Sequence, residues 1–308
     1  MTRTTGRGLL REAHSERFAI PAFNVSNLET IQGVIAAAEA ASAPVFLQLS
    51  PGALAYAGYD TLLRLVADLA ERASAPVVLH LDHCRDPATV ERAIDDGFGS
   101  VMYDGSALPL EENVATTRRL VERARARDDG LAVEAELGRI GGREDTDPAD
   151  AWASRTTPRE AVEFVDATGI DVLAPNLGNL HRMPDDSMRL DVGQIRAIAE
   201  ATGRPLALHG GSGVELEQLR AAIEAGVGKV NISSRVTRAL AAGIRETWAE
   251  DPEQLDLRRY LGRGREAVQA LAAAYIDRCG VAGRASAPGE PASPPAGPVW
   301  TAHDTEAE

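Results

Sequence analysis

The sequence predicts a single α/β domain folded as a (β/α)8 barrel, and three observations favour this fold. Short runs of Val, Leu, Ile and Ala alternate with amphipathic helical segments along most of the chain. The runs recur about every 25–35 residues, the spacing of a strand followed by a loop and a helix. There are eight of them, which is the number that closes a parallel barrel.

Each apolar run has the length and composition of a strand that is buried on both faces. The predicted strands span residues 18–23, 44–49, 76–81, 100–103, 131–136, 172–175, 205–208 and 229–232. A doubly wound sheet is the alternative for such a pattern. That fold usually carries a glycine-rich turn after its first strand, and none follows Asn24.

Local signals place helices between the strands. Segments 26–29 and 157–160 both have the pattern of a capping box, which satisfies the free N–H groups of a helix start. Gly169 and Gly203 stand where helices should end, since glycine readily takes the left-handed backbone of a helix C-terminus. These signals support one strand–helix unit after another.

Two segments interrupt the repeat. Residues 137–156 lack periodicity and contain glycines and acids, and loops of this length tend to be lids or site loops. From residue 283 the chain is rich in Pro, Ala, Gly and Ser and cannot bury a core. We therefore expect a barrel domain over residues 1–282 and a disordered tail over 283–308.

Composition excludes several classes of protein. The net charge is −14, whereas a general nucleic-acid binder needs a basic surface. Two distant cysteines do not suggest a disulfide framework. No apolar run reaches the length of a membrane span, and residues 1–16 do not resemble a signal peptide. We expect a cytoplasmic protein without membrane or nucleic-acid partners.

Polar and ionisable residues gather where the predicted strands end, the rim on which barrels build active sites. They are Asn24, Gln48, Ser50, His80, Asp82, His83, Asp104, Ser106, Glu134, Glu136, Asn179, His181, His209, Asn231, Ser233 and Ser234. The sequence therefore predicts a site at the carboxyl ends of the strands.

Histidines from three different strands indicate a zinc site with an open position for substrate. His83, His181 and His209 fit this pattern, while His80 could support the site from behind. Asp82 is open to three interpretations: a metal ligand, a general acid or a helix cap. The acids at 134 and 136 share one strand face, where they would meet a metal, cations or a salt-bridge partner.

The segment from His209 to Gly213 is a glycine-rich turn ahead of a helix. Together with residues 231–234 it occupies the end of strands seven and eight, where barrels commonly bind phosphate. A tight turn without a ligand is the alternative, but the position favours phosphate binding.

At these residues the chain resembles class II, zinc-dependent fructose-bisphosphate and tagatose-bisphosphate aldolases. The matching stretches are PAFNVSNLETIQGVIAAAE (21–39), VFLQLSPGA (45–53), LHLDH (79–83), SVMYDGSALPLEENV (100–114), VEAELGRIGGRED (133–145), LAPNLGNLH (173–181), LALHGGSG (206–213) and GVGKVNI (226–232). They occur in family order over roughly residues 10–275.

The resemblance implies a role for each matching position. The catalytic zinc ligands are His83, His181 and His209, and Asp104 and Glu136 hold the metal in an alternative or second site. Asp82 protonates the aldehyde oxygen in condensation, and Glu144 is the base that deprotonates the ketone donor. Substrate contacts fall on Asn24, Ser50 and Asn231. The phosphate cradle, which also takes a monovalent cation in the family, consists of Gly210, Gly211, Ser212, Ser233 and Ser234.

The chain departs from the family near the donor phosphate. Arg182 stands where glycine is usual, and Ser233 and Arg235 replace the common residues after Asn231. Arg182 and Arg235 could together bind phosphate in place of a missing lysine. Alternatively, Arg182 fills the pocket or meets a carboxylate on an unusual donor. We expect an aldolase that reversibly cleaves a ketose bisphosphate to dihydroxyacetone phosphate and an aldehyde. The alternatives are an altered donor or acceptor, such as another keto-sugar phosphate or a keto acid, and a non-catalytic sugar-phosphate-binding protein.

The single lysine of the chain, Lys229, favours metal chemistry independently of the resemblance. Imine-forming aldolases need a lysine projecting at a catalytic strand end, typically strand six. Residues 172–175 contain none. The family also suggests a homo-oligomer, either a dimer or a tetramer.

Overall fold

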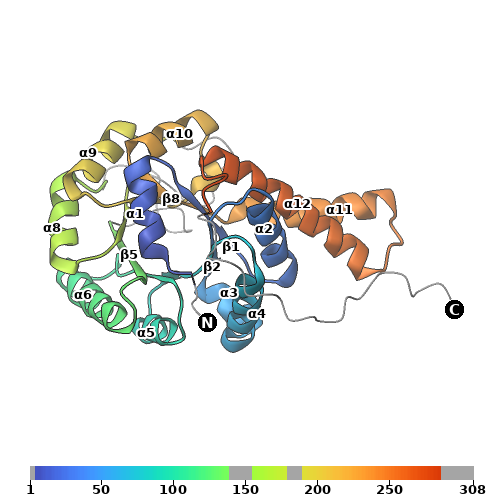
Figure 1. Cartoon of the computed structure of the whole chain (residues 1–308), viewed down its shortest axis with the longest axis horizontal. Helices are drawn as coiled ribbons and strands as arrows, with labels where there is room; N and C mark the ends of the chain where they lie inside the picture. The colour runs from blue at the N-terminus through green and yellow to red at the C-terminus, as the bar shows by residue number, and fades with distance from the viewer. Residues whose placement is uncertain (1–3, 139–154, 179–188, 286–308) are drawn as a thin grey trace.

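The structure, a computed structural model, describes residues 4–138, 155–178 and 189–285. Eight parallel strands close into a barrel in sequence order, so the predicted (β/α)8 fold is confirmed (Figure 1). The strands are β1 (Ile20–Asn24), β2 (Val45–Leu49), β3 (Val77–Cys84), β4 (Ser100–Tyr103), β5 (Ala132–Leu137), β6 (Val172–Pro175), β7 (Leu206–Leu208) and β8 (Val227–Ile232). They agree with the predicted ranges to within two residues, except that β3 runs on to Cys84.

Helices surround the barrel (Figure 1). They are α1 (Gly6–Glu16), α2 (Leu28–Ala40), α3 (Pro51–Ala57), α4 (Tyr59–Arg72), α5 (Pro87–Asp95), α6 (Leu110–Arg127), α8 (Pro158–Thr168), α9 (Val192–Thr202), α10 (Leu216–Ala225), α11 (Ser234–Glu250) and α12 (Leu257–Arg278), with a short 3₁₀ turn at Gly211–Gly213. Among the described residues, no helix is long and apolar enough to cross a membrane.

The helix signals were predicted with one error. Thr157 and Glu160 form the predicted capping box of α8, and Gly169 and Gly203 end α8 and α9 in the left-handed conformation. The capping box predicted at 26–29 is wrong, because α2 begins one residue later. Asn27 has the extended backbone of a cap, its side chain accepts from the N–H of Thr30, and the Thr30 side chain accepts in return.

Helix α1 covers the amino end of the barrel and so leaves the carboxyl end for a site (Figure 1). The N–H of Gly6 donates to the carbonyl of Gly99, and the N–H of Arg7 donates to the carbonyl of Gly130. Asp171, which is buried just before β6, accepts from Arg7, Arg125 and the backbone N–H of Val133. These contacts hold the amino ends of β4, β5 and β6 together.

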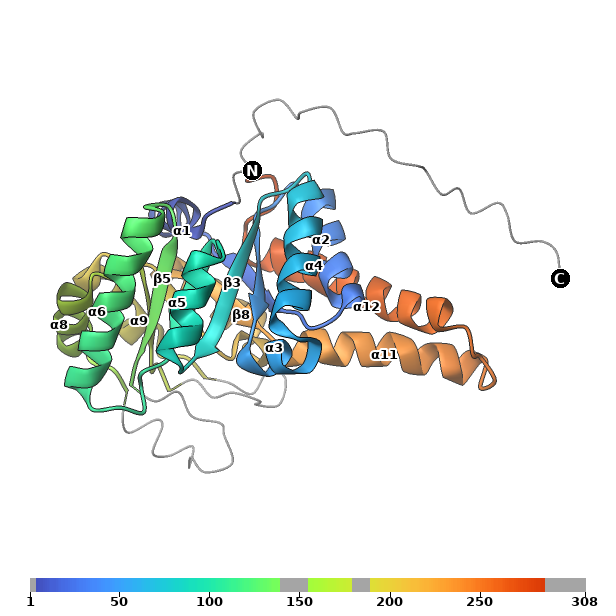
Figure 2. The same ribbon diagram turned by 90° about the horizontal axis from the view of Figure 1, so that it is seen from below.

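Helices α11 and α12 lie side by side and extend away from the barrel as an arm (Figures 1 and 2). Gly243 allows this close approach, since a Cβ atom there would lie 2.5 Å from the carbonyl oxygen of Arg263. Beyond α12, the N–H groups of Gly283 and Ala285 donate to the carbonyls of Ala41 and Ser42. The rest of the predicted tail and most of the predicted 137–156 loop lie outside the described residues.

Both cysteines are buried, and this makes a testable prediction. Burial raises the pKa of the Cys84 thiol, and it raises that of Cys279 to about 12. Because the thiolate is the reactive form, the folded protein at pH 8 should react with a chromogenic disulfide reagent much more slowly than the urea-unfolded chain. Two thiols should titrate after unfolding. Rapid labelling of either cysteine in the folded protein would contradict this packing.

Candidate functional site

The carboxyl rim of the barrel collects the polar side chains that the sequence places at the strand ends. Asp82 and His83 come from β3, Glu136 from β5 and Asn231 from β8, while His209 directly follows β7. All are buried except His83, which is partly exposed. The parallel register therefore brings together residues that are up to 149 positions apart in the sequence.

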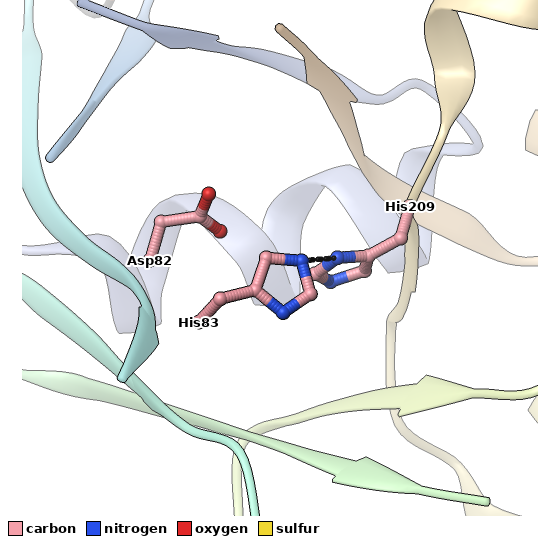
Figure 3. Close-up of side chains that lie close together, drawn as sticks. All are labelled: Asp82, His83 and His209. Carbon is pink, nitrogen blue, oxygen red and sulfur yellow. Dashed lines mark hydrogen bonds between the residues drawn. The ribbon is translucent and has the colours of Figure 1, made fainter. Parts of the chain in front are cut away.

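Asp82, His83 and His209 form the centre of this cluster (Figure 3). One ligand atom from each residue lies within 4.8 Å of the others. Nε2 of His83 and Nδ1 of His209 are 2.7 Å apart. Nitrogen and oxygen donors gathered in this way could hold a metal ion such as zinc.

A break in strand β3 turns Asp82 and His83 toward the same place. Successive residues of a regular strand point to opposite faces. Here the pairing of β3 with β4 shifts register between Leu81 and Cys84, and His83 has a left-handed φ of 48°. Such a backbone is costly for a residue other than glycine, and strain of this kind concentrates at functional sites.

The orientation of His209 is set from behind by Glu134. Nε2 of His209 lies 2.8 Å from Oε1 of Glu134. A carboxylate only accepts hydrogen bonds, so Nε2 carries a proton and donates to Glu134. This contact turns Nδ1, the other ring nitrogen, toward His83, where it could bind a metal.

A second group of ligand atoms shares His83. Its side chain, together with those of Asp104 and Glu136, places one ligand atom each within 4.8 Å of the others. Nδ1 of His83 lies 3.5 Å from Oε2 of Glu136. Asp104 accepts from Nε of Arg85 at 2.9 Å and from the Ser106 hydroxyl at 2.6 Å. Burial alone would raise the pKa of Asp104, but these two hydrogen bonds and the charge of His83 lower it overall.

Asp82 is held as a carboxylate by its neighbours. Its Oδ2 accepts from Nδ2 of Asn24 at 2.8 Å, and Asn24 in turn accepts from Gln48. Burial opposes the charge, but His83, Lys229, His209 and the Asn24 hydrogen bond outweigh it and lower the pKa of Asp82. The helix that follows is capped by Asp86, so the helix-cap interpretation of Asp82 is wrong.

The distance between the two imidazoles tests how well the site fits a metal. Two nitrogens bound to one tetrahedral zinc at about 2.0–2.1 Å from it are roughly 3.3 Å apart. The observed separation of 2.7 Å is that of a hydrogen bond between the rings. A metal bound to both nitrogens would therefore require a small separation of the rings.

The glycine-rich turn after β7 meets the start of α11. Gly210 has a left-handed φ of 71°, and a Cβ atom on Gly211 would lie 2.6 Å from Cγ1 of Val230. The Ser212 hydroxyl accepts from the N–H of Ser233 at 3.3 Å, and the Ser212 carbonyl accepts from Nε of Arg235 at 2.7 Å. Backbone N–H groups of a turn and of a helix start thus lie side by side, as in anion sites.

Of the remaining predicted residues, some belong to the described part of the chain and others lie outside it. The Ser50 hydroxyl, on the rim after β2, accepts from the N–H of Ala53 and caps α3. Ser234 begins α11. The third predicted zinc ligand, His181, lies outside the described residues, as do Glu144 and Arg182.

Three residues at the site carry more than the sequence indicated. The sequence leaves Glu134 open between metal binding and ion pairing, and in the structure it contacts both His209 and Lys229. Arg85, whose side chain is half exposed, pairs with Asp104; its place two positions after a predicted ligand is the one signal for it in the sequence. For Lys229 the sequence indicates only that it does not suit imine chemistry.

Comparison with known proteins decides the family. The model of "Fructose-bisphosphate aldolase class-II" matches residues 4–284. The chain belongs to the class II fructose-bisphosphate aldolase family. It is 39% identical to the fructose-bisphosphate aldolase of Geobacillus stearothermophilus, over 93% of this chain and 100% of the relative.

Two solved structures share the fold and most of the length. The YdjI aldolase of Escherichia coli K12 superposes with a TM-score of 0.81 at 31% identity, covering 92% of this chain and 100% of that one. A putative fructose-1,6-bisphosphate aldolase of Coccidioides immitis gives a TM-score of 0.80 at 39% identity, covering 92% and 98%. The protein is therefore an aldolase, a carbon–carbon lyase, and the non-catalytic alternative falls away.

The close backbone at Gly211 makes the aldolase sensitive to a single methyl group. Gly211→Ala places a Cβ atom 2.6 Å from Val230 and 3.0 Å from the carbonyl oxygen of Asn231. We expect the free energy of unfolding in urea to fall by about 1–3 kcal/mol. Gly262→Ala is the control, because nothing lies within 4 Å of that Cβ position in α12. Equal stability of Gly211→Ala and the wild type would contradict the observed packing.

Proposed function

We propose that the protein is a Zn²⁺-dependent aldolase that reversibly cleaves a ketose bisphosphate to dihydroxyacetone phosphate and an aldehyde. The observation that carries the proposal is the convergence of Asp82, His83 and His209 within 4.8 Å at the carboxyl rim. The membership of the class II family supports it. The name of the G. stearothermophilus relative suggests fructose 1,6-bisphosphate as the first substrate to test.

The metal would be held by His83 and His209, with His181 as the third ligand. His83, Asp104 and Glu136 offer an alternative or second position. When bound, the zinc ion supplies a Lewis acid that draws electron density from the donor carbonyl. Glu134 bonds the ring nitrogen of His209 that faces away from the site, so the other nitrogen, Nδ1, faces the metal position.

Asp82 would move the proton of the substrate hydroxyl. Its lowered pKa leaves a carboxylate at neutral pH, which accepts the hydroxyl proton in cleavage. In condensation the same carboxyl returns the proton to the aldehyde oxygen. Asn24 and Asn231 fix its two oxygens, so the proton is exchanged at a defined place. Glu144 is proposed as the base that acts on the donor carbon.

The donor phosphate would lie on the turn of Gly210, Gly211 and Ser212 and at the start of α11, with Ser233 and Ser234. Backbone N–H groups and the positive end of a helix dipole both favour an anion there. A monovalent cation is proposed at the same turn. Arg182 and Arg235 would add the positive charge that a lysine supplies in relatives.

An altered donor remains the second proposal, and one contact favours it. Arg235 donates to the Ser212 carbonyl, so its guanidinium is built into the predicted phosphate turn rather than standing apart from it. A donor with a differently placed anionic group would be accommodated by this change. A homo-oligomer and a cytoplasmic location stay predictions.

Removal of metal tests the central part of the proposal. Dialysis against EDTA should abolish cleavage of fructose 1,6-bisphosphate in a coupled assay, and added Zn²⁺ or Co²⁺ should restore it. The metal content of each sample is measured by mass spectrometry. Full activity in protein shown to be free of metal would sink the zinc proposal, whatever substrate is used.

The phosphate proposal is tested at Arg235. Loss of a charge-assisted hydrogen bond costs about 1.5–3 kcal/mol, so Arg235→Gln should raise the KM for a phosphorylated donor by roughly 10- to 150-fold. The control is Arg245→Gln, an exposed residue almost three turns further along α11, which should leave the KM close to that of the wild type. An unchanged KM in Arg235→Gln would remove this residue from the donor site.

A further inference from the structure

The single lysine of the chain lies inside the barrel. Lys229 sits on β8, and its side chain is fully buried. The other cations counted with it are arginines, 31 of the 32 basic residues. A buried ammonium is costly unless each of its N–H donors has a partner. The groups around Nζ therefore show how this charge is stabilised.

Three acceptors surround the ammonium. Nζ lies 2.9 Å from Oε2 of Glu134, 2.9 Å from Oδ1 of Asn231 and 3.5 Å from Nε2 of His80. An ammonium has three N–H donors and no acceptor, which matches this set. Burial lowers the pKa of His80 well below its usual range, and the charge of Lys229 acts in the same direction. His80 is therefore neutral, and its Nδ1 donates to the Ser100 hydroxyl at 2.8 Å.

Two of these acceptors lead directly to the site. The other oxygen of Glu134 bonds Nε2 of His209 at 2.8 Å. The amide of Asn231, with its oxygen turned to Lys229, directs its nitrogen to Oδ1 of Asp82 at 3.4 Å. One cation thus fixes both the predicted zinc ligand and the predicted proton carrier.

We propose that Lys229 is a positioning residue that raises the metal affinity of the site and orients Asp82, acting through Glu134 and Asn231. Its ammonium holds the Glu134 carboxylate against Nε2 of His209, so that Nδ1 of His209 faces His83. It also fixes which end of the Asn231 amide meets Asp82. The inference rests on the proposed zinc site and deepens it.

Lysine is the basic residue that fits this role. The space around Nζ is closed, since His80, Glu134 and Lys229 are all fully buried and the ring of Phe46 packs edge-on against His80. Arginine carries a planar fork of five donors, which needs more room and more acceptors than this set provides. Lys229→Arg should therefore not restore the function of the residue despite its equal charge.

The test measures zinc binding rather than turnover. Lys229→Met keeps about the length of the side chain and removes its charge. Glu134→Gln removes the carboxylate that bonds His209. Competition with a chromophoric chelator should show zinc affinity reduced about 10- to 100-fold in each, as for other changes behind metal ligands. The double variant should be no weaker than the weaker single one, because the two residues act in series.

Asp171→Asn is the matched control. Asp171 is also a buried, ion-paired carboxylate of the barrel, but it lies at the amino end and bonds Arg7 and Arg125. This variant should lower the melting temperature and leave zinc affinity unchanged. The control separates a loss of stability from a loss of metal positioning.

A second readout uses the fact that the chain has one lysine. Protein labelled with ¹⁵N at lysine Nζ should give a single ammonium resonance. Zinc should shift this resonance in the wild type and shift it much less in Glu134→Gln. If Lys229→Met does not fold, Glu134→Gln and this resonance decide the question alone.

The outcomes are distinct. Wild-type zinc affinity in Glu134→Gln or in folded Lys229→Met, or an affinity loss of equal size in Asp171→Asn, overturns the role of Lys229 while the zinc site stands. Restored affinity in Lys229→Arg contradicts the requirement for an ammonium. Absence of zinc binding by the wild type overturns this inference together with the proposed metal site.

Discussion

The ion pair between Lys229 and Glu134 is the interaction around which the interior of the barrel is organised. Both side chains are fully buried, and their charged atoms are 2.9 Å apart. Removing one partner of such a pair costs about 3–5 kcal/mol, because the other charge is left without compensation. The pair therefore stays closed, and the groups bonded to it keep fixed orientations. The ring of His209 is oriented by this pair, because its Nε2 bonds the Glu134 carboxylate.

The barrel supplies the rest of the site by bringing strand ends to one rim. Helix α1 covers the amino end of the barrel, so the site lies at the carboxyl end. A regular strand would send Asp82 and His83 to opposite faces, and the left-handed backbone of His83 overcomes this limit. The strained backbone is held in place by the pairing of β3 with β2 on one side and β4 on the other. The turn after β7 needs glycine at position 211, since its backbone lies against β8.

Much of the fold was predictable from the sequence, because strands and helix caps are encoded locally. The eight apolar runs gave the strands, and Thr157 with Glu160 gave the start of α8. Ser26 and Asn27 are both good caps, and only the backbone geometry selects Asn27. The contact of Lys229 with Glu134 was not predictable, since it joins residues 95 positions apart across a closed barrel. Its existence depends on the barrel interior, which no local pattern describes.

A crystal structure of the zinc-soaked protein, with data collected on both sides of the zinc absorption edge, tests the role of this ion pair most directly. We expect an anomalous peak bonded to Nε2 of His83 and to Nδ1 of His209, with Nε2 of His209 still bonded to Glu134 and Glu134 still paired with Lys229. Zinc bound through Nε2 of His209, or a rim without a zinc peak, would contradict this arrangement.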